Sequence, residues 1–145
     1  MPAGRLRLRT DGASRGNPGH AGIGVVLESE DGSVIDEIAE YVDRQTNNVA
    51  EYMALARALD RALELGASEV EVFSDSELMV RQVQGAYEVK NAALRLLFTR
   101  VEGLARRFRV FRIQHVPRAK NKRADALANQ AIDRALGKSS TAADV

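Results

Sequence analysis

The chain contains no cysteine and only two histidines, His20 and His115, among its 145 residues. The lack of cysteine excludes disulfide frameworks, cysteine–zinc sites and thiol nucleophiles, and two histidines are too few for a three-histidine zinc site. No apolar run approaches the ~20 residues of a membrane span. Residues 1–10, with their alternating arginine and leucine, lack the apolar centre of a signal peptide. We therefore expect a cytoplasmic protein that does not bind a membrane.

The chain also has no large excess of either charge, because 21 lysines and arginines face 20 aspartates and glutamates, for a net charge of +1. Hydrophobic residues make up 45% and charged residues 28%, which is typical of a globular domain and excludes wholesale disorder. The basic residues nevertheless gather late in the chain, at Arg106, Arg107, Arg109, Arg112, Arg118, Lys120, Lys122 and Arg123. This segment indicates either a phosphate-binding surface or a solvated basic face.

The hydrophobic pattern predicts one α/β domain. Strands are predicted at residues 5–10, 21–29, 34–42, 70–74 and 109–115. Helices are predicted from an N-cap at Thr46 or Asn47 to Gly66, and at residues 76–84, 94–108 and 124–136. Residues 11–19 are expected to form a turn-rich loop. Three strands followed by alternating helices and strands predict a mixed sheet. We place this domain at residues 1–136 and expect a flexible tail at residues 137–145.

Four carboxylates lie at the ends of predicted elements: Asp11, Glu51, Asp75 and Asp125. Adjacent strands would bring Asp11 and Asp75 together at the carboxyl edge of the sheet, where ligands of α/β proteins bind. Carboxylates that close repel one another unless a cation lies between them, and their hard oxygens favour Mg²⁺ or Mn²⁺. Four such ligands suit a two-metal site for phosphoryl transfer. Taken singly, each has a structural alternative as a turn former, a solvated side chain or a helix cap.

Four sequence blocks carry a resemblance to a known family. They are TDGASRGNPG at residues 10–19, TNNVAEYMAL at 46–55, SDSELMVRQVQG at 74–85 and HVPRAKNKRADALAN at 115–129. In this order they resemble the motifs of type 1 ribonuclease H. The resemblance implies a ribonuclease H-like fold, with a five-stranded mixed sheet and helices on both faces. It also implies endonucleolytic cleavage of the RNA strand of an RNA–DNA hybrid with two Mg²⁺ ions, for which Mn²⁺ can substitute.

The same resemblance assigns roles to single residues. The catalytic and metal-ligating carboxylates of the family map onto Asp11, Glu51, Asp75 and Asp125. The expected substrate-binding residues are Gly12, Asn17, Thr46, Asn47, Asn48, Ser76, Glu77, Arg118 and Asn121. Side-chain amides suit recognition of the RNA 2′-hydroxyl, and Asn17 with Thr46 resembles the pocket that holds a DNA-strand phosphate. Their structural alternatives are helix capping and turn formation.

Several features depart from the family pattern. Only residues 86–89 separate Gly85 from Lys90, so the long basic insertion of many relatives is absent. Hybrid affinity is then expected from the late basic residues Arg118, Lys120, Lys122 and Arg123. The resemblance leaves open whether duplex RNA is a second partner, as relatives without the insertion allow. The loop after His115 lacks the histidine of many relatives, and we predict that Arg118 contacts the scissile phosphate instead. We expect a monomer. Arg9, on a central strand, has no explanation in the sequence.

Two other functions compete with the nuclease. A ribonuclease H-like module that binds hybrids without cutting them is disfavoured, because four carboxylates near phosphate weaken binding unless a metal is present. A phosphatase of the haloacid dehalogenase type would need a second aspartate two residues after Asp11, and that residue is Ala13.

Overall fold

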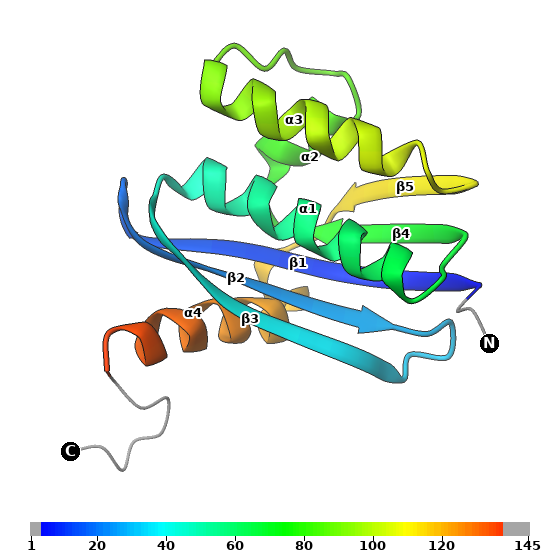
Figure 1. Cartoon of the computed structure of the whole chain (residues 1–145), viewed down its shortest axis with the longest axis horizontal. Helices are drawn as coiled ribbons and strands as arrows, with labels where there is room; N and C mark the ends of the chain where they lie inside the picture. Colours follow the sequence, from blue (N-terminus) through cyan, green and yellow to red (C-terminus); the bar gives the residue numbers. More distant parts are fainter. Residues whose placement is uncertain (1–3, 138–145) are drawn as a thin grey trace.

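The computed structural model describes residues 4–137, which form a five-stranded mixed sheet with helices on both faces (Figure 1). The elements are β1 (Arg5–Gly16), β2 (Gly19–Glu28), β3 (Val34–Gln45), α1 (Asn47–Glu64), β4 (Glu69–Ser74), α2 (Glu77–Val83), α3 (Ala92–Ala105), β5 (Val110–His115), the 3-10 turn η1 (Arg118–Lys120) and α4 (Lys122–Ala135). The sheet order is β3-β2-β1-β4-β5, antiparallel from β3 to β1 and parallel from β1 to β5. The predicted fold class is confirmed.

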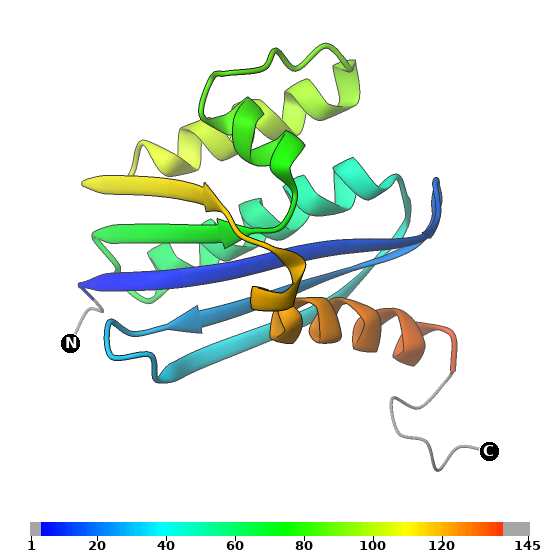
Figure 2. The ribbon, with the colours of Figure 1, turned by 180° about the vertical axis from the view of Figure 1, so that it is seen from behind.

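The helices divide unequally between the two faces of the sheet. In both ribbon views α1, α2 and α3 lie on one side, and α4 lies alone on the other, against the antiparallel strands (Figures 1 and 2). The main core fills the first side, where Leu8, Val25 and Val72 of the sheet meet Leu55 and Leu59 of α1. These apolar residues alternate along the strands and repeat at helical spacing along α1, as the hydrophobic pattern requires.

Two glycines of β2 allow α4 to approach the sheet closely. A Cβ atom at Gly24 would lie 2.0 Å from the carbonyl oxygen of Ala124, and one at Gly22 would lie 2.4 Å from that of Ala128. Both distances are far shorter than atoms tolerate, so only glycine fits beneath the helix backbone. This close contact places the first turn of α4, and Asp125 within it, over β1 and β2.

Some predicted boundaries were wrong. Residues 11–16 continue β1 and do not form a loop, because antiparallel pairing with β2 extends to the pair Gly16–Gly19 and satisfies the backbone. Helix α3 ends at Ala105 and not at Phe108, which is buried in the core from the turn that follows and so extends the apolar pattern. The tail predicted at residues 137–145 lies outside the described residues except for Gly137. No helix of the described part of the chain is long and apolar enough to span a membrane.

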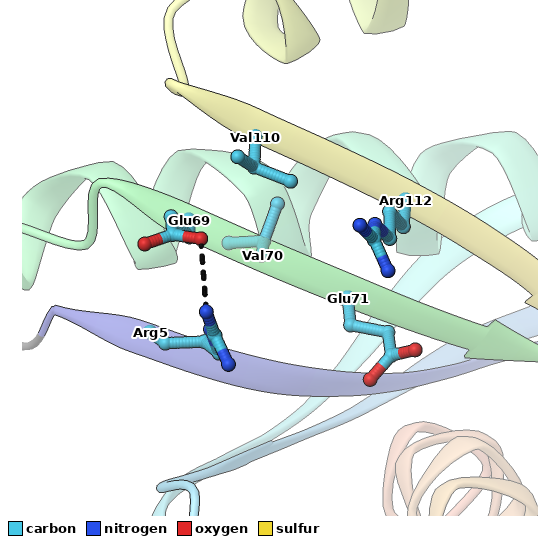
Figure 3. Close-up of a pocket in the computed structure, with 6 residues that line it drawn as sticks. All are labelled: Arg5, Glu69, Val70, Glu71, Val110 and Arg112. Carbon is cyan, nitrogen blue, oxygen red and sulfur yellow. Dashed lines mark hydrogen bonds and ion pairs between the residues drawn. The ribbon is translucent and has the colours of Figure 1, made fainter.

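The strands β1, β4 and β5 carry polar side chains on the face that α4 leaves uncovered. Figure 3 shows Arg5, Glu69, Glu71 and Arg112 around a shallow cavity of about 130 Å³ at the start of β4. Arg5 donates to Glu69 at 3.2 Å, and Arg109 pairs with the same carboxylate. Two arginines and two glutamates thus line the cavity, and their charges cancel. The cavity lies at the opposite end of β4 from Asp75.

Candidate active site

Asp11 and Asp75 lie beside each other where β1 and β4 separate. The last parallel pair between these strands joins Thr10 to Ser74, so Asp11 is the next residue on β1 and Asp75 is the first residue after β4. Beyond this point β4 ends while β1 continues along β2, and the sheet opens. Asp11 is only 2% exposed, and the side chain of Asp75 is 10% exposed. Parallel pairing therefore delivers two carboxylates to one buried point.

Glu51 reaches the same point from α1. It is 4% exposed, and its Oε1 accepts a hydrogen bond from the backbone N–H of Gly12 at 2.9 Å. Helix α1 lies so close to β1 here that a Cβ atom at Gly12 would be 2.3 Å from the backbone of Ala50 and of Glu51. Gly12 therefore has a packing role in the structure, and its N–H fixes the direction of the Glu51 carboxylate.

Asp11, Glu51 and Asp75 form a carboxylate cluster that fits a hard cation. One oxygen of each residue can be chosen so that all three lie within 4.8 Å of one another. Oδ2 of Asp11 and Oδ2 of Asp75 are buried and have no hydrogen-bond partner. Buried anionic oxygens without donors are costly, and oxygen ligands are what Mg²⁺ and Mn²⁺ prefer. The residues present therefore match a divalent-metal site.

The environment of the cluster opposes ionisation. Burial raises the pKa of Asp11 to about 10, with further increases from the charges of Glu51 and Asp75 and from the Asp125 carboxyl. Burial and the charge of Asp75 raise the pKa of Glu51 to about 8, while the Gly12 N–H and Arg118 act in the opposite direction. The cluster by itself therefore retains protons at neutral pH, and a cation would displace them.

The fourth predicted carboxylate, Asp125, lies in the first turn of α4 next to Asp11 but outside the three-residue cluster. Asn121 precedes this helix, and it is 1% exposed. Its amide Nδ2 donates to the carbonyl oxygen of Thr10 at 2.8 Å and so ties the start of α4 to β1. Asn121 therefore helps to place Asp125, and its predicted role in binding substrate stays a prediction.

The structure explains why an arginine, Arg9, occurs on a central strand: its side chain contacts the η1 turn that precedes α4. Its Nε contacts Glu28 at 3.2 Å, and its Nη1 donates to the carbonyl oxygen of Lys120 at 3.4 Å. The guanidinium lies over the ring of Phe73, 4.8 Å from the ring centroid, in cation–π geometry. A charged residue is tolerated on this central strand because α4 leaves that part of the face open.

The other predicted substrate-binding residues lie around the cluster. Thr46 caps α1 by accepting from the N–H of Val49, and Oδ1 of Asn17 accepts from the N–H of Asn47 at 3.0 Å. These contacts bring the end of β1 to the N-terminus of α1, next to Asn48. Ser76 caps α2, and Glu77 is exposed one residue later. Their roles toward substrate stay predictions.

Arg118 lies beside the cluster in η1. Its Nε is 3.9 Å from Oδ2 of Asp75, and its side chain is 80% exposed. It is thus a cation that can face both the carboxylates and solvent. His115 is exposed at the end of β5, as expected, and not in this loop. Sequence reasoning missed one neighbour of the site, Asn129, although its spacing of four residues from Asp125 on a helix indicates contact.

Comparison with known proteins identifies the family. A family model described as "Reverse transcriptase-like" matches residues 9–131. Ribonuclease HI of Halobacterium salinarum is 46% identical over 130 residues, covering 90% of this chain and 65% of that protein. "Bifunctional protein Rv2228c" of Mycobacterium tuberculosis is 45% identical over 141 residues, covering 97% of this chain. The chain spans only 39% of that second protein's length.

Two solved structures agree with these sequence matches. The crystal structure of the Halobacterium salinarum RNase H1 superposes with a TM-score of 0.88 at 46% identity, covering 90% of this chain and 99% of that one. LC11-RNase H1, solved in complex with an RNA/DNA hybrid, gives a TM-score of 0.87 at 47% identity, with the same coverage of 90% and 99%. The resemblance seen in the sequence is confirmed, and the chain belongs to the type 1 ribonuclease H family.

Proposed function

We propose that this chain is a metal-dependent endonuclease that hydrolyses the RNA strand of RNA–DNA hybrids and acts as a monomer. The observation that carries the proposal is the cluster of Asp11, Glu51 and Asp75, in which two buried carboxylate oxygens have no hydrogen-bond partner. Membership of the ribonuclease H family, and the hybrid bound to LC11-RNase H1, supply the substrate class. Together they favour phosphodiester hydrolysis over simple binding.

The four carboxylates Asp11, Glu51, Asp75 and Asp125 would hold two Mg²⁺ ions, or Mn²⁺ in their place. When bound, such a pair of ions stabilises the attacking and leaving oxygens of phosphoryl transfer. The chain's own contribution is to bring the ligands together, to exclude donors that would compete for them, and to keep Glu51 aimed by the Gly12 N–H. A site preorganised in this way needs little rearrangement during the reaction.

Contacts with the hybrid would lie on two sides of the cluster. The N-terminus of the 18-residue helix α1, with Asn17, Thr46 and Asn47, offers backbone N–H groups and a positive dipole end to a DNA-strand phosphate. Asn48 and Asn47 supply amides for the RNA 2′-hydroxyl. On the other side, Arg118 would face the scissile phosphate. These contacts would orient the RNA strand over the carboxylates.

Fewer basic side chains near the cluster are free to attract phosphates of the hybrid than the sequence indicated. Arg123 is committed to Glu37, because two of its nitrogens lie 2.7 Å from the two carboxylate oxygens. Lys120 and Lys122 are exposed next to Arg118. We therefore assign hybrid attraction near the cluster to Arg118, Lys120 and Lys122. Binding should weaken with salt as phosphate contacts release counterions.

The test is a cleavage assay with labelled RNA–DNA hybrid, duplex RNA and duplex DNA, each with Mg²⁺, Mn²⁺ or chelator. We expect cuts within the RNA strand of the hybrid, which disappear with chelator and in Asp11→Asn. The duplex RNA arm decides whether the chain also cuts that substrate, which relatives without the basic insertion can accept. Hybrid that is bound but never cut in either metal would favour the binding-module alternative and contradict the proposal.

A further inference from the structure

Asp125, Asn129 and Asp133 lie one turn apart along α4 and face the end of β1. Arg15, near the end of β1, reaches this stripe of the helix: its Nη1 lies 2.7 Å from Oδ1 of Asp133. Its Nη2 donates to the backbone oxygen of Asn129 at 3.3 Å and to Oδ1 of Asn129 at 3.2 Å. Arg15 therefore joins β1 to α4 through Asn129 and Asp133.

Asn129 contacts Asp125 with the other end of its amide. Nδ2 of Asn129 donates to the backbone oxygen of Asp125 at 3.0 Å and to its carboxylate Oδ1 at 3.3 Å. Asp125 lies in the first turn of α4, which packs against β1, and its carboxyl is one of the groups that raise the pKa of Asp11. A continuous set of contacts therefore leads from Arg15, through Asn129, to the carboxylate cluster.

The direction of the amide follows from the chemistry of its neighbours. A guanidinium has donors only, so the side of Asn129 that faces Arg15 must be the carbonyl oxygen. The amide nitrogen then faces Asp125, where a donor is needed. If Arg15 were absent, the amide could turn over and place its oxygen against the Asp125 carboxylate. Arg15 therefore selects the one orientation of Asn129 in which the amide nitrogen donates to the Asp125 carboxylate.

We propose that Asn129, oriented by Arg15, is a positioning residue that holds the Asp125 carboxylate toward Asp11 and so sets how tightly the site binds a divalent ion. The inference rests on the proposed function. Asp125 is half-buried and lies outside the three-residue cluster, so the direction of its carboxylate depends on a separate hydrogen-bond donor such as Asn129. Residues that orient metal ligands typically change metal affinity when they are removed.

The experiment measures Mn²⁺ binding to the protein without substrate by calorimetry, and kcat and KM on a hybrid. Asn129→Leu should weaken Mn²⁺ binding about tenfold or more and lower kcat, with KM for the hybrid unchanged. Arg15→Leu should weaken Mn²⁺ binding in the same direction but less. The double variant should bind Mn²⁺ as Asn129→Leu does, because Arg15 acts through Asn129 and the two losses do not add.

Matched controls separate this role from loss of packing or charge. Arg15→Lys keeps a donor-only cation and should retain most of the Mn²⁺ affinity. Arg100→Leu removes a comparable 2.7 Å ion pair, with Asp60, far from the cluster and should leave Mn²⁺ affinity unchanged. Gln130→Leu, the residue next to Asn129 on α4, should also leave it unchanged.

The inference is overturned if wild type binds Mn²⁺ and cleaves hybrid while Asn129→Leu binds Mn²⁺ equally well, even at a lower melting temperature. Additive losses in the double variant would also overturn it. If Asn129→Leu does not fold, unchanged Mn²⁺ affinity in Arg15→Leu has the same meaning, since Arg15 lies at the surface. A wild type that neither binds Mn²⁺ nor cleaves hybrid would instead refute the proposed function, and this inference with it.

Discussion

The backbone N–H of Gly12 donates to Oε1 of Glu51 at 2.9 Å, across the contact between β1 and α1. The hydrogen bond exists only because Gly12 has no Cβ atom, which would lie 2.3 Å from the backbone of Ala50 and Glu51. Gly12→Ala should therefore force α1 away from β1 and lower the free energy of unfolding by about 2–4 kcal/mol. Hybrid cleavage should fall more than tenfold. Chemical denaturation and a cleavage assay check both effects.

A second glycine provides the control for this prediction. Gly103 lies inside α3, and a Cβ atom placed there would meet nothing within 4 Å. Gly103→Ala should therefore raise the free energy of unfolding by about 0.5–1 kcal/mol, the helix preference of alanine over glycine, and leave cleavage unchanged. Equal stability of Gly12→Ala and wild type would show that the β1–α1 contact is looser than described.

The stability of the metal-free protein should depend on pH through the carboxylate cluster. Folding raises the pKa of Asp11 to about 10 and of Glu51 to about 8, so the folded state binds more protons than the unfolded state above about pH 4. Stability must then fall as pH rises toward these folded values. In chelator, the melting temperature should be lower at pH 8 than at pH 6. Excess Mn²⁺ should reduce this difference. A melting temperature that rises over this range would contradict the assignment.

Removing one charge from the cluster should stabilise the metal-free protein and abolish its activity. Asp11 is 2% exposed beside Glu51 and Asp75, and its raised pKa means that folding at pH 8 must add a proton to this carboxyl, a cost that Asp11→Asn removes. In chelator at pH 8, its melting temperature should exceed that of wild type by several degrees, and its dependence on pH should be weaker. Hybrid cleavage should disappear. Asp60→Asn, at a partly exposed carboxylate of α1, should change neither the pH dependence nor cleavage.

Much of the site could be predicted because it depends on strand ends. Strict alternation at residues 5–10 and the short run at residues 70–74 predicted strands, and parallel pairing places the residue after each predicted strand at one edge of the sheet. That rule alone brings Asp11 and Asp75 together. An N-cap at Thr46 or Asn47, followed by apolar residues at helical spacing, predicted the start of α1 and so placed Glu51 in its first turns; the structure has Thr46 as the cap.

Other features could not be predicted because their causes lie in distant segments. Gly12 and Gly16 resembled turn residues, yet β1 continues past Gly12 and ends only at Gly16, because β2 pairs with it. Nothing in the sequence around Gly24 indicates that the backbone of α4 packs directly against this glycine. Arg9 is satisfied by groups from β2, β4 and η1, which the sequence alone does not bring together. Local propensity therefore predicted the elements, and tertiary contacts decided which side chains reach the site.

Arg118 provides the last prediction, since it combines high exposure with a position beside the cluster. Its side chain is 80% exposed and lies 3.9 Å from Oδ2 of Asp75, so little packing depends on it. Arg118→Ala should leave the melting temperature in chelator unchanged but lower kcat on a hybrid by about 10²-fold, the typical effect of losing one donor to a reacting phosphate or oxyanion. Arg118→Lys, which keeps the charge but loses the planar guanidinium group, should recover part of that loss.

Arg107→Ala, at an exposed arginine after α3, is the control and should cleave at the wild-type rate. If Arg118→Ala instead raises KM while kcat stays the same, Arg118 attracts the hybrid and does not act on the scissile phosphate.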